Sequence, residues 1–364
     1  MSVLYSYFRS MYLRRILLYP VAMGYGLVMR LRNLMFGRGL LPSMEHGLPV
    51  ISVGNLAAGG TGKTPHVEYL IRLLRGKYEL ATLSRGYGRS TRGYRLAGPG
   101  DDHSTIGDEP LQYRNKFPEV VVAVSERRNT GVEALTRLPG PPEVVLLDDA
   151  FQHRSLRPGL SILLTDYHSL YTRDYILPAG YLREPRTAAR RADILIVTKT
   201  PEVLSPITRR DIAAELKPEA HQQLYFTHIT YDAPVPLTPE ATGMNLKEVT
   251  AVFLLAGIAN PYPLEEHLRR TVDLVLTYQY PDHYNYREKD IQLLARAFHD
   301  HLARKKVLLT TEKDAMRLGQ ANLLSLLQGI PVAYVPIRVS FHGEDGRDFD
   351  ERILRYVEQN KRMP

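Results

Sequence analysis

The sequence has no cysteine among its 364 residues. Without thiols the chain has no disulfide framework, no thiolate metal site and no cysteine nucleophile, and this fits a reducing compartment. Internal repeats and low-complexity tracts are also missing. Hydrophobic residues make up 44% and charged residues 24% of the chain, close to the globular average, so disorder is excluded as a description of the whole. At about 150 residues per domain, the length suggests two domains.

The N-terminal segment lacks an apolar run long enough for a simple bilayer span. Residues 16–29 are 14 uncharged residues, which as a helix cover roughly 21 Å of a hydrocarbon core roughly 30 Å thick. Residues 1–47 hold six arginines against one acid, Glu45, and so supply +5 of the net charge of +8. Five tyrosines accompany them. We predict a helix over 2–36 that lies in a membrane interface, with arginines reaching toward lipid phosphates. A helix packed on the protein's own core is the alternative.

Two other classes are disfavoured by what is missing. No small-residue cleavage site follows the apolar run, so a cleaved signal peptide fits poorly. Zinc-finger spacing and an RNA-binding aromatic signature are both absent, and most of the basic excess lies in the N-terminal segment. We therefore expect a membrane lipid surface as a partner and expect neither nucleic acid nor an obligate protein partner.

A glycine-rich loop follows the first β-branched run. The run at 49–53 leads into Gly54-Asn55-Leu56-Ala57-Ala58-Gly59-Gly60-Thr61-Gly62-Lys63-Thr64. Such loops turn backbone N–H groups toward phosphate oxygens, the lysine reaches the β- and γ-phosphates, and the threonine hydroxyl helps to hold Mg²⁺. Pro65 suits a first helical turn, and an apolar stripe follows it. Ala57 departs from the usual pattern, which has glycine there. The nucleotide-binding residues are predicted to be Asn55, Ala57, Ala58, Gly59, Gly60, Thr61, Gly62, Lys63 and Thr64.

A phosphate loop requires an acidic partner at the end of a neighbouring strand. Residues 143–149 supply an apolar strand that ends in Asp148 and Asp149. Two adjacent acids can also cap a turn, but beside a phosphate loop they are predicted, with Thr64, to place Mg²⁺.

The apolar runs predict an α/β fold in two parts. Runs at 50–53, 80–83, 120–124, 144–147, 161–164 and 194–198 alternate with helical or loop segments, as a mostly parallel three-layer α/β/α sheet requires. We predict an N-terminal membrane-associating segment (1–47), a P-loop NTPase-like domain (48–205), a linker with an isolated strand at 224–231 (206–248), and a smaller α/β domain (249–364). In the smaller domain, strands are expected near 250–256, 273–277, 306–310 and 331–335.

The motifs together resemble the tetraacyldisaccharide 4′-kinase family, the lipid A 4′-kinases of Gram-negative bacteria. Beside the phosphate loop, the resemblance is carried by these runs in the family's order: Ser84 to Arg89, Gly107-Asp108-Glu109-Pro110, Asp148 to His153, Leu177 to Pro185, Ala256 to Pro261, Asp282-His283-Tyr284 and Thr310 to Ala315. The similarity as a whole covers about residues 10–340. Ala150 and Tyr181 depart from the family's usual glycine and Gly-Pro-Leu-Arg-Glu-Pro patterns, and neither change removes a charged group.

The resemblance implies transfer of the γ-phosphate of MgATP to the 4′-hydroxyl of an acylated glucosamine disaccharide 1-phosphate, at the cytoplasmic face of the bacterial inner membrane. A sugar hydroxyl is a weak nucleophile, so the reaction needs a positioned base and cations on the phosphates. By resemblance, Asp108 is the base assisted by His283, and Lys63 neutralises the transferring group. Arg127 or Arg128, of which Arg128 is preferred, is a further candidate for transition-state charge or for the substrate's 1-phosphate. The remaining site candidates are Glu109, Gln152, His153, Arg183 and Glu184.

Each of these residues also has an ordinary structural interpretation. Asp108 before Glu109-Pro110 is a common helix cap, His283 beside Asp282 fits a surface turn, and Arg183 with Glu184 fits a surface ion pair.

Two rival functions remain from the sequence. A membrane-associated nucleotide switch is disfavoured, because a GTPase carries Asn-Lys-x-Asp and a partitioning ATPase has a lysine where this chain has Ala58. A soluble small-molecule kinase whose N-terminal helix merely packs is separated from a lipid kinase by dependence of activity on vesicles or detergent.

Overall fold

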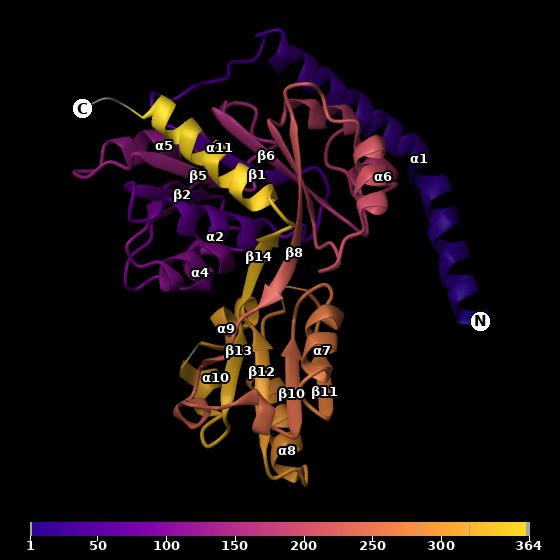
Figure 1. The fold of residues 1–364 in the computed structure, drawn as a ribbon, viewed down its shortest axis with the longest axis vertical. Helices are drawn as coiled ribbons and strands as arrows, with labels where there is room; N and C mark the ends of the chain where they lie inside the picture. Colours follow the sequence, from indigo (N-terminus) through magenta and orange to yellow (C-terminus); the bar gives the residue numbers. More distant parts are fainter. Residues whose placement is uncertain (1, 283, 320, 362–364) are drawn as a thin grey trace.

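The larger of two sheets has nine strands in the order β14-β8-β7-β6-β1-β5-β2-β4-β3 (Figure 1). The computed structural model describes residues 2–282, 284–319 and 321–361, and it describes the side chains of these residues except for 2–15 and 321. The strands are β1 (Val50–Asn55), β2 (Leu80–Ser84), β3 (Arg95–Leu96), β4 (Val121–Val124), β5 (Val144–Asp148), β6 (Leu160–Asp166), β7 (Ile194–Thr198), β8 (Gln223–Tyr231) and β14 (Ile337–Phe341). Only β3 and β14 pair antiparallel to their neighbours in this sheet.

Helices cover both faces of this sheet, so the predicted three-layer α/β/α arrangement is confirmed. One face is covered by α2 (Lys63–Leu74), α4 (Asp108–Lys116) and α11 (Asp345–Asn360), and the other by α5 (Arg128–Thr136) and α6 (Pro206–Leu216). The short helix α3 (His103–Ile106) precedes α4. Because both faces are packed, the central strands are continuous apolar runs rather than alternating ones.

The smaller sheet has the order β11-β10-β12-β13-β9. Its strands are β9 (Val235–Pro236), β10 (Ala251–Ala256), β11 (Leu274–Gln279), β12 (Lys306–Thr311) and β13 (Val332–Val335). Its helices are α7 (Tyr262–Arg269), α8 (Glu288–Asp300), α9 (Glu312–Leu318) and α10 (Ala321–Ser325). The four strands expected from the sequence are all present, and the short β9 adds an antiparallel edge.

Strand pairing corrects two of the sequence-based boundaries. The strand expected to be isolated, β8, pairs with β7 on one side and with β14 on the other. Residues 337–360, predicted to belong to the smaller domain, return to the larger sheet as β14 and α11. They do so because Phe349, Ile353 and Val357 of α11 form one apolar stripe that is buried in the core of the larger sheet.

The N-terminal helix α1 (Ser2–Gly37) runs past α6, and its N-terminal end stands apart from both sheets (Figure 1). It continues through Pro20, so the predicted helix over 2–36 is confirmed. Ala22 is buried, and Gly26 allows close packing, since a Cβ there would lie 3.6 Å from Ile176. In the described part of the chain, no helix combines the length and the apolarity that a membrane crossing needs.

Candidate active site

The phosphate loop joins the end of β1 to the start of α2. Gly59 (φ 129°) and Gly62 (φ 85°) adopt backbone angles that side chains disfavour, so glycine is required at both positions. Lys63 is the first residue of α2, and its Nζ lies 3.4 Å from Asn55 Oδ1 and 3.6 Å from Asp149 Oδ1. The first turn of α2 has no acidic residue, so its exposed N–H groups and positive dipole end favour an anion.

The side chain of Ala57 fits the backbone conformation of the phosphate loop without strain. It forms an antiparallel bridge with Leu182, and the next residue, Ala58, donates its N–H to the carbonyl of Tyr181 (2.7 Å). Arg183 in turn donates its N–H to the Leu56 carbonyl (2.8 Å). The segment around 181–183 therefore lies along the phosphate loop, and extended backbone at 57 makes a glycine unnecessary.

Asp148 is the buried acid beside the loop. It ends β5 in register with Val53 of β1, and its Oδ2 accepts a hydrogen bond from the Tyr113 hydroxyl (3.0 Å). Among the described residues, its buried Oδ1 has no partner. Burial, with Glu109 and Asp149 nearby, raises the pKa of Asp148 to about 7. Such a carboxylate favours a bound cation.

Asp149 forms ion pairs with two cationic side chains. It adopts a positive φ of 49°, and its carboxylate pairs with Lys63 and with Arg183 (3.1 Å). Burial alone would raise the pKa of Asp149, but Lys63 and Arg183 outweigh burial and hold that pKa below its ordinary value.

The residues at this site fit a magnesium ion held mainly by a nucleotide. Within the described residues, no three His, Cys, Asp or Glu side chains gather as a metal site. Mg²⁺ usually takes only one or two protein carboxylates and completes its shell with phosphates and water. Asp148, with its orphaned Oδ1, and the Thr64 hydroxyl are suited to that role.

Asp108 is the first residue of α4 and is 8% exposed. Gly107 is the N-cap of this helix, and Asp108 lies one position inside it, so Asp108 does not occupy the capping position that the alternative interpretation gave it. The Asp108 Oδ2 atom accepts hydrogen bonds from Nη2 and Nε (3.2 Å) of Arg317, a buried residue of α9 in the smaller sheet unit. His283 lies outside the described residues.

Two more ion pairs join α4 to α9 beside Asp108. Lys116 pairs with Glu312 (2.6 Å), and Glu109 pairs with Lys313 (3.2 Å). Lys116 also contacts the buried Glu68 of α2 (2.7 Å), the helix that follows the phosphate loop. These contacts hold the smaller sheet unit against the elements that carry Lys63 and Asp108.

Arg128 and His153 lie close to the acids at the end of β5, Asp148 and Asp149. Arg128 is 1% exposed, and its guanidinium donates to the backbone carbonyls of Ser125 and, at 3.4 Å, of Asp148. Burial lowers the pKa of Arg128 to about 10. Burial, with Arg128 and Arg85 nearby, lowers the pKa of His153 to about 4, so this imidazole is neutral at pH 7. A direct role of either side chain in catalysis stays a prediction.

Gln152, Arg183 and Glu184 connect the site to α1. Gln152 Nε2 donates to the Asn55 carbonyl (2.8 Å), and its Oε1 lies 3.4 Å from Arg183 Nη1. Glu184 is completely buried and pairs with Arg191 (2.9 Å) rather than with its neighbour Arg183. The surface ion pair considered from the sequence is therefore not present.

Among the described side chains of α1, three hydrogen-bond to residues of this region. Arg32 is one of the arginines expected from the sequence to reach toward lipid phosphates, but its guanidinium instead contacts the protein. Tyr25 donates its hydroxyl to the Arg183 carbonyl (3.0 Å), Arg32 donates to the Gln152 carbonyl (3.0 Å), and Asn33 donates to Glu184 Oε2 (2.7 Å). The C-terminal half of α1 is thus bonded to the same residues that contact the phosphate loop and Asp149.

We expect Glu184→Gln to lower the free energy of unfolding by about 2 kcal/mol, because the charge-assisted bonds of Arg191 and Asn33 both end on this buried carboxylate. Urea denaturation of the full chain measures the loss. Glu358→Gln, at an exposed carboxylate, is the control and should leave the unfolding midpoint in place. Equal midpoints for the two variants would mean that the buried Glu184 carboxylate does not stabilise the fold.

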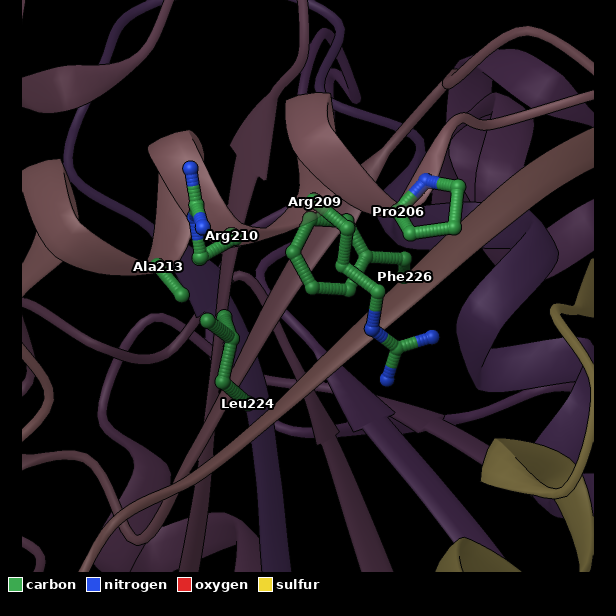
Figure 2. Close-up of a pocket in the computed structure, with 6 residues that line it drawn as sticks. All are labelled: Pro206, Arg209, Arg210, Ala213, Leu224 and Phe226. Atoms are coloured by element: carbon green, nitrogen blue, oxygen red, sulfur yellow. The ribbon is translucent and has the colours of Figure 1, made fainter.

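A separate pocket lies between α6 and β8 (Figure 2). It is lined by Pro206, Arg209, Arg210, Ala213, Leu224 and Phe226. The Arg209 guanidinium stacks 4.8 Å from the Phe226 ring centroid and pairs with Asp345 (2.6 Å). None of the predicted site residues lines this pocket.

The fold and the loop define a phosphate-loop nucleotide-binding protein of the α/β class. Over residues 14–358 the chain matches the family model described as tetraacyldisaccharide-1-P 4′-kinase. It is 43% identical over 350 residues to a tetraacyldisaccharide 4′-kinase of Flavobacterium johnsoniae, covering 96% of this chain and 99% of that one. It is 44% identical to one of Bacteroides thetaiotaomicron, covering 95% and 94%. The chain belongs to the tetraacyldisaccharide 4′-kinase family.

A solved structure agrees with this membership. The crystal structure of LpxK from Aquifex aeolicus in complex with ATP superposes with a TM-score of 0.70 at 28% identity, over 94% of this chain and 99% of that one. The likeness covers both sheets, since so little of either chain is left out.

Proposed function

We propose that this chain transfers the γ-phosphate of ATP to the 4′-hydroxyl of a tetraacylated glucosamine disaccharide 1-phosphate, in lipid A biosynthesis. The observation that carries the proposal is the meeting of the loop after β1 with the end of β5 at one edge of the larger sheet. The loop after β1 brings Lys63 within 3.6 Å of Asp149, and Asp148 ends the adjacent strand with a buried, unpartnered oxygen among the described residues. This arrangement suits a nucleotide triphosphate with its cation.

Each residue of the site has its own role in phosphoryl transfer. Lys63 neutralises charge on the transferring phosphate, and backbone N–H groups of the loop bind phosphate oxygens. Thr64 and Asp148 hold Mg²⁺, which when bound supplies positive charge to the phosphate oxygens. Asp108 takes the proton of the sugar hydroxyl, and His283 is assigned to assist it on the family resemblance alone.

The test is a kinase assay with radiolabelled ATP and the acylated disaccharide 1-phosphate in detergent micelles. We expect phosphate to appear on the lipid and not on a matched sugar without acyl chains. Equal transfer to both acceptors would favour the rival, a soluble small-molecule kinase. No transfer to either acceptor would overturn the proposal.

We also propose that α1 carries the enzyme to an anionic membrane surface, at the cytoplasmic face of the inner membrane. Leu17 (76% exposed), Val21, Val28 and Leu31 follow helical spacing along one side of α1, and all four are exposed. The opposite side holds the buried Ala22 and Asn33, which donates to Glu184. The exposed stripe supports shallow insertion among lipid headgroups.

The double variant Leu17→Glu with Val28→Glu should lower sedimentation with anionic vesicles about tenfold or more, because two carboxylates meet the acyl boundary and repel anionic lipid. The control is Leu302→Glu, a leucine that is 96% exposed on the smaller sheet unit. Comparable loss in the control, or full binding by the double variant, would place the membrane contact elsewhere.

A further inference from the structure

Four consecutive carbonyl groups of the phosphate loop, those of residues 59–62, each lie within hydrogen-bond distance of a side-chain donor. The pairs, in chain order of the carbonyls, are Asn55 with Gly59 (3.4 Å), Lys199 with Gly60, Thr198 with Thr61 (2.9 Å) and His66 with Gly62 (2.7 Å). A carbonyl oxygen only accepts, so each side chain is the donor, and His66 carries its proton on Nδ1.

The direction of these carbonyls decides where the loop's N–H groups point. The peptide unit is planar and trans, so the carbonyl of one residue and the N–H of the next point in opposite directions. Fixing the carbonyls of 59–62 therefore fixes the N–H groups of 60–63. One of these, the N–H of Thr61, donates to the Gly59 carbonyl within the loop (3.2 Å), so it turns to a ligand only when that bond opens.

Two of the donors come from the end of β7. Thr198 is completely buried, and its hydroxyl also lies 3.3 Å from the Thr165 carbonyl. Lys199 is one of three non-glycine residues with positive φ (56°) among the described residues, a conformation that costs energy and tends to persist at functional positions. Its ammonium is held between the Gly60 carbonyl and Asp166 (2.8 Å).

The third donor outside the predicted site is the buried His66 of α2. Its Nε2 lies 3.1 Å from the Thr227 hydroxyl of β8. With Nδ1 protonated, Nε2 is the acceptor for that hydroxyl, which fixes both the tautomer and the ring plane. The donor to Gly62 is therefore itself held by a neighbouring strand.

We propose that Thr198, Lys199 and His66, here called the carbonyl clamp, are positioning residues for the nucleotide. They hold the carbonyls of residues 60–62 away from the nucleotide, and by fixing the Thr61 and Gly62 carbonyls they aim the N–H groups of Gly62 and Lys63 at its phosphates. The inference rests on the proposed binding of ATP by this loop. Without the clamp, a carbonyl dipole can turn toward the phosphates, where like partial charges repel.

Thr198→Val tests the clamp without changing charge or shape. We expect the Kd for ATP, measured by calorimetry on the full chain, to rise about tenfold, the loss of one buried hydrogen bond. The KM for ATP should rise in parallel, while the KM for the acylated disaccharide stays within about twofold. Thr198→Ser keeps the hydroxyl and should restore the Kd. A residue with a merely structural role would lower the melting temperature without this selective change.

Two control variants make the same chemical changes at positions away from the phosphate loop. Thr238→Val removes a buried hydroxyl that donates to the Ile330 carbonyl (2.8 Å) in the smaller sheet unit, and it should leave the Kd unchanged. Lys199→Gly keeps the backbone conformation but deletes the donor, and Lys217→Gly does the same at an exposed residue with φ 46°. We expect weaker ATP binding only for Lys199→Gly.

The outcomes distinguish failure of the carbonyl clamp from failure of the proposed ATP binding. Wild-type protein that fails to bind ATP overturns the nucleotide assignment and the clamp together. Wild-type binding with an unchanged Kd in Thr198→Val overturns the clamp alone. An equal rise in Thr238→Val also overturns it, since the effect would then belong to any buried threonine.

Discussion

Replacing Lys63 by alanine is expected to lower kcat/KM about 10³-fold, the range seen when a preorganised group that stabilises transition-state charge is removed. Lys63 Nζ is the cationic group that the loop itself supplies, and it is held by Asn55 and Asp149. Without it the developing charge on the transferring phosphate loses a partner, while Asp149 keeps its pairing with Arg183. Initial rates with radiolabelled ATP and the acylated disaccharide 1-phosphate measure the loss.

Lys247→Ala is the matched control, because Lys247 is exposed and lies far along the chain in the segment before β10. Its rate should equal the wild-type rate. Lys63→Met, which keeps the length and apolar stem of the side chain, should be as inactive as Lys63→Ala. Turnover within tenfold of wild type in both Lys63 variants would refute the assignment of the loop to the transferring phosphate.

The parts of the fold that the sequence predicted are those with local signals. A β-branched run, a glycine loop and a helix-starting proline are contiguous, so the segment from Val50 through α2 could be recognised without any tertiary information. The acids at the end of β5 could be paired with that loop because parallel strands end at the same edge of a sheet.

Contacts between distant segments could not be predicted in the same way. Arg317 lies 209 residues from Asp108, and Asn33 lies 151 residues from Glu184. Neither pair has a period, spacing or flanking residue that marks it. The return of α11 to the larger sheet is a similar case, since its apolar stripe predicts a helix with one buried face but does not say which sheet covers that face.

The second large effect is expected from Asp108→Asn, which should lower kcat about 10³-fold while the Kd for ATP changes less than about threefold. The amide keeps the size of the side chain but cannot take the proton of the sugar hydroxyl. Single-turnover rates report the chemical step, and calorimetry reports ATP binding. Asp300→Asn, at an exposed carboxylate at the end of α8, is the control. Parallel losses in rate and in ATP affinity would instead make Asp108 a structural residue.

The role predicted for Asp108 can also be tested through its partner, Arg317. Its guanidinium is anchored within the smaller sheet unit by Asp314 (3.3 Å), and it reaches Asp108 Oδ2 across the joint between α9 and α4. If Arg317 acts only by orienting a reacting carboxylate, Arg317→Met lowers kcat in the wild-type background but has no further effect on kcat in Asp108→Asn. A double-mutant cycle on kcat measures this coupling. Additive losses would mean that Arg317 acts on catalysis by a route independent of Asp108.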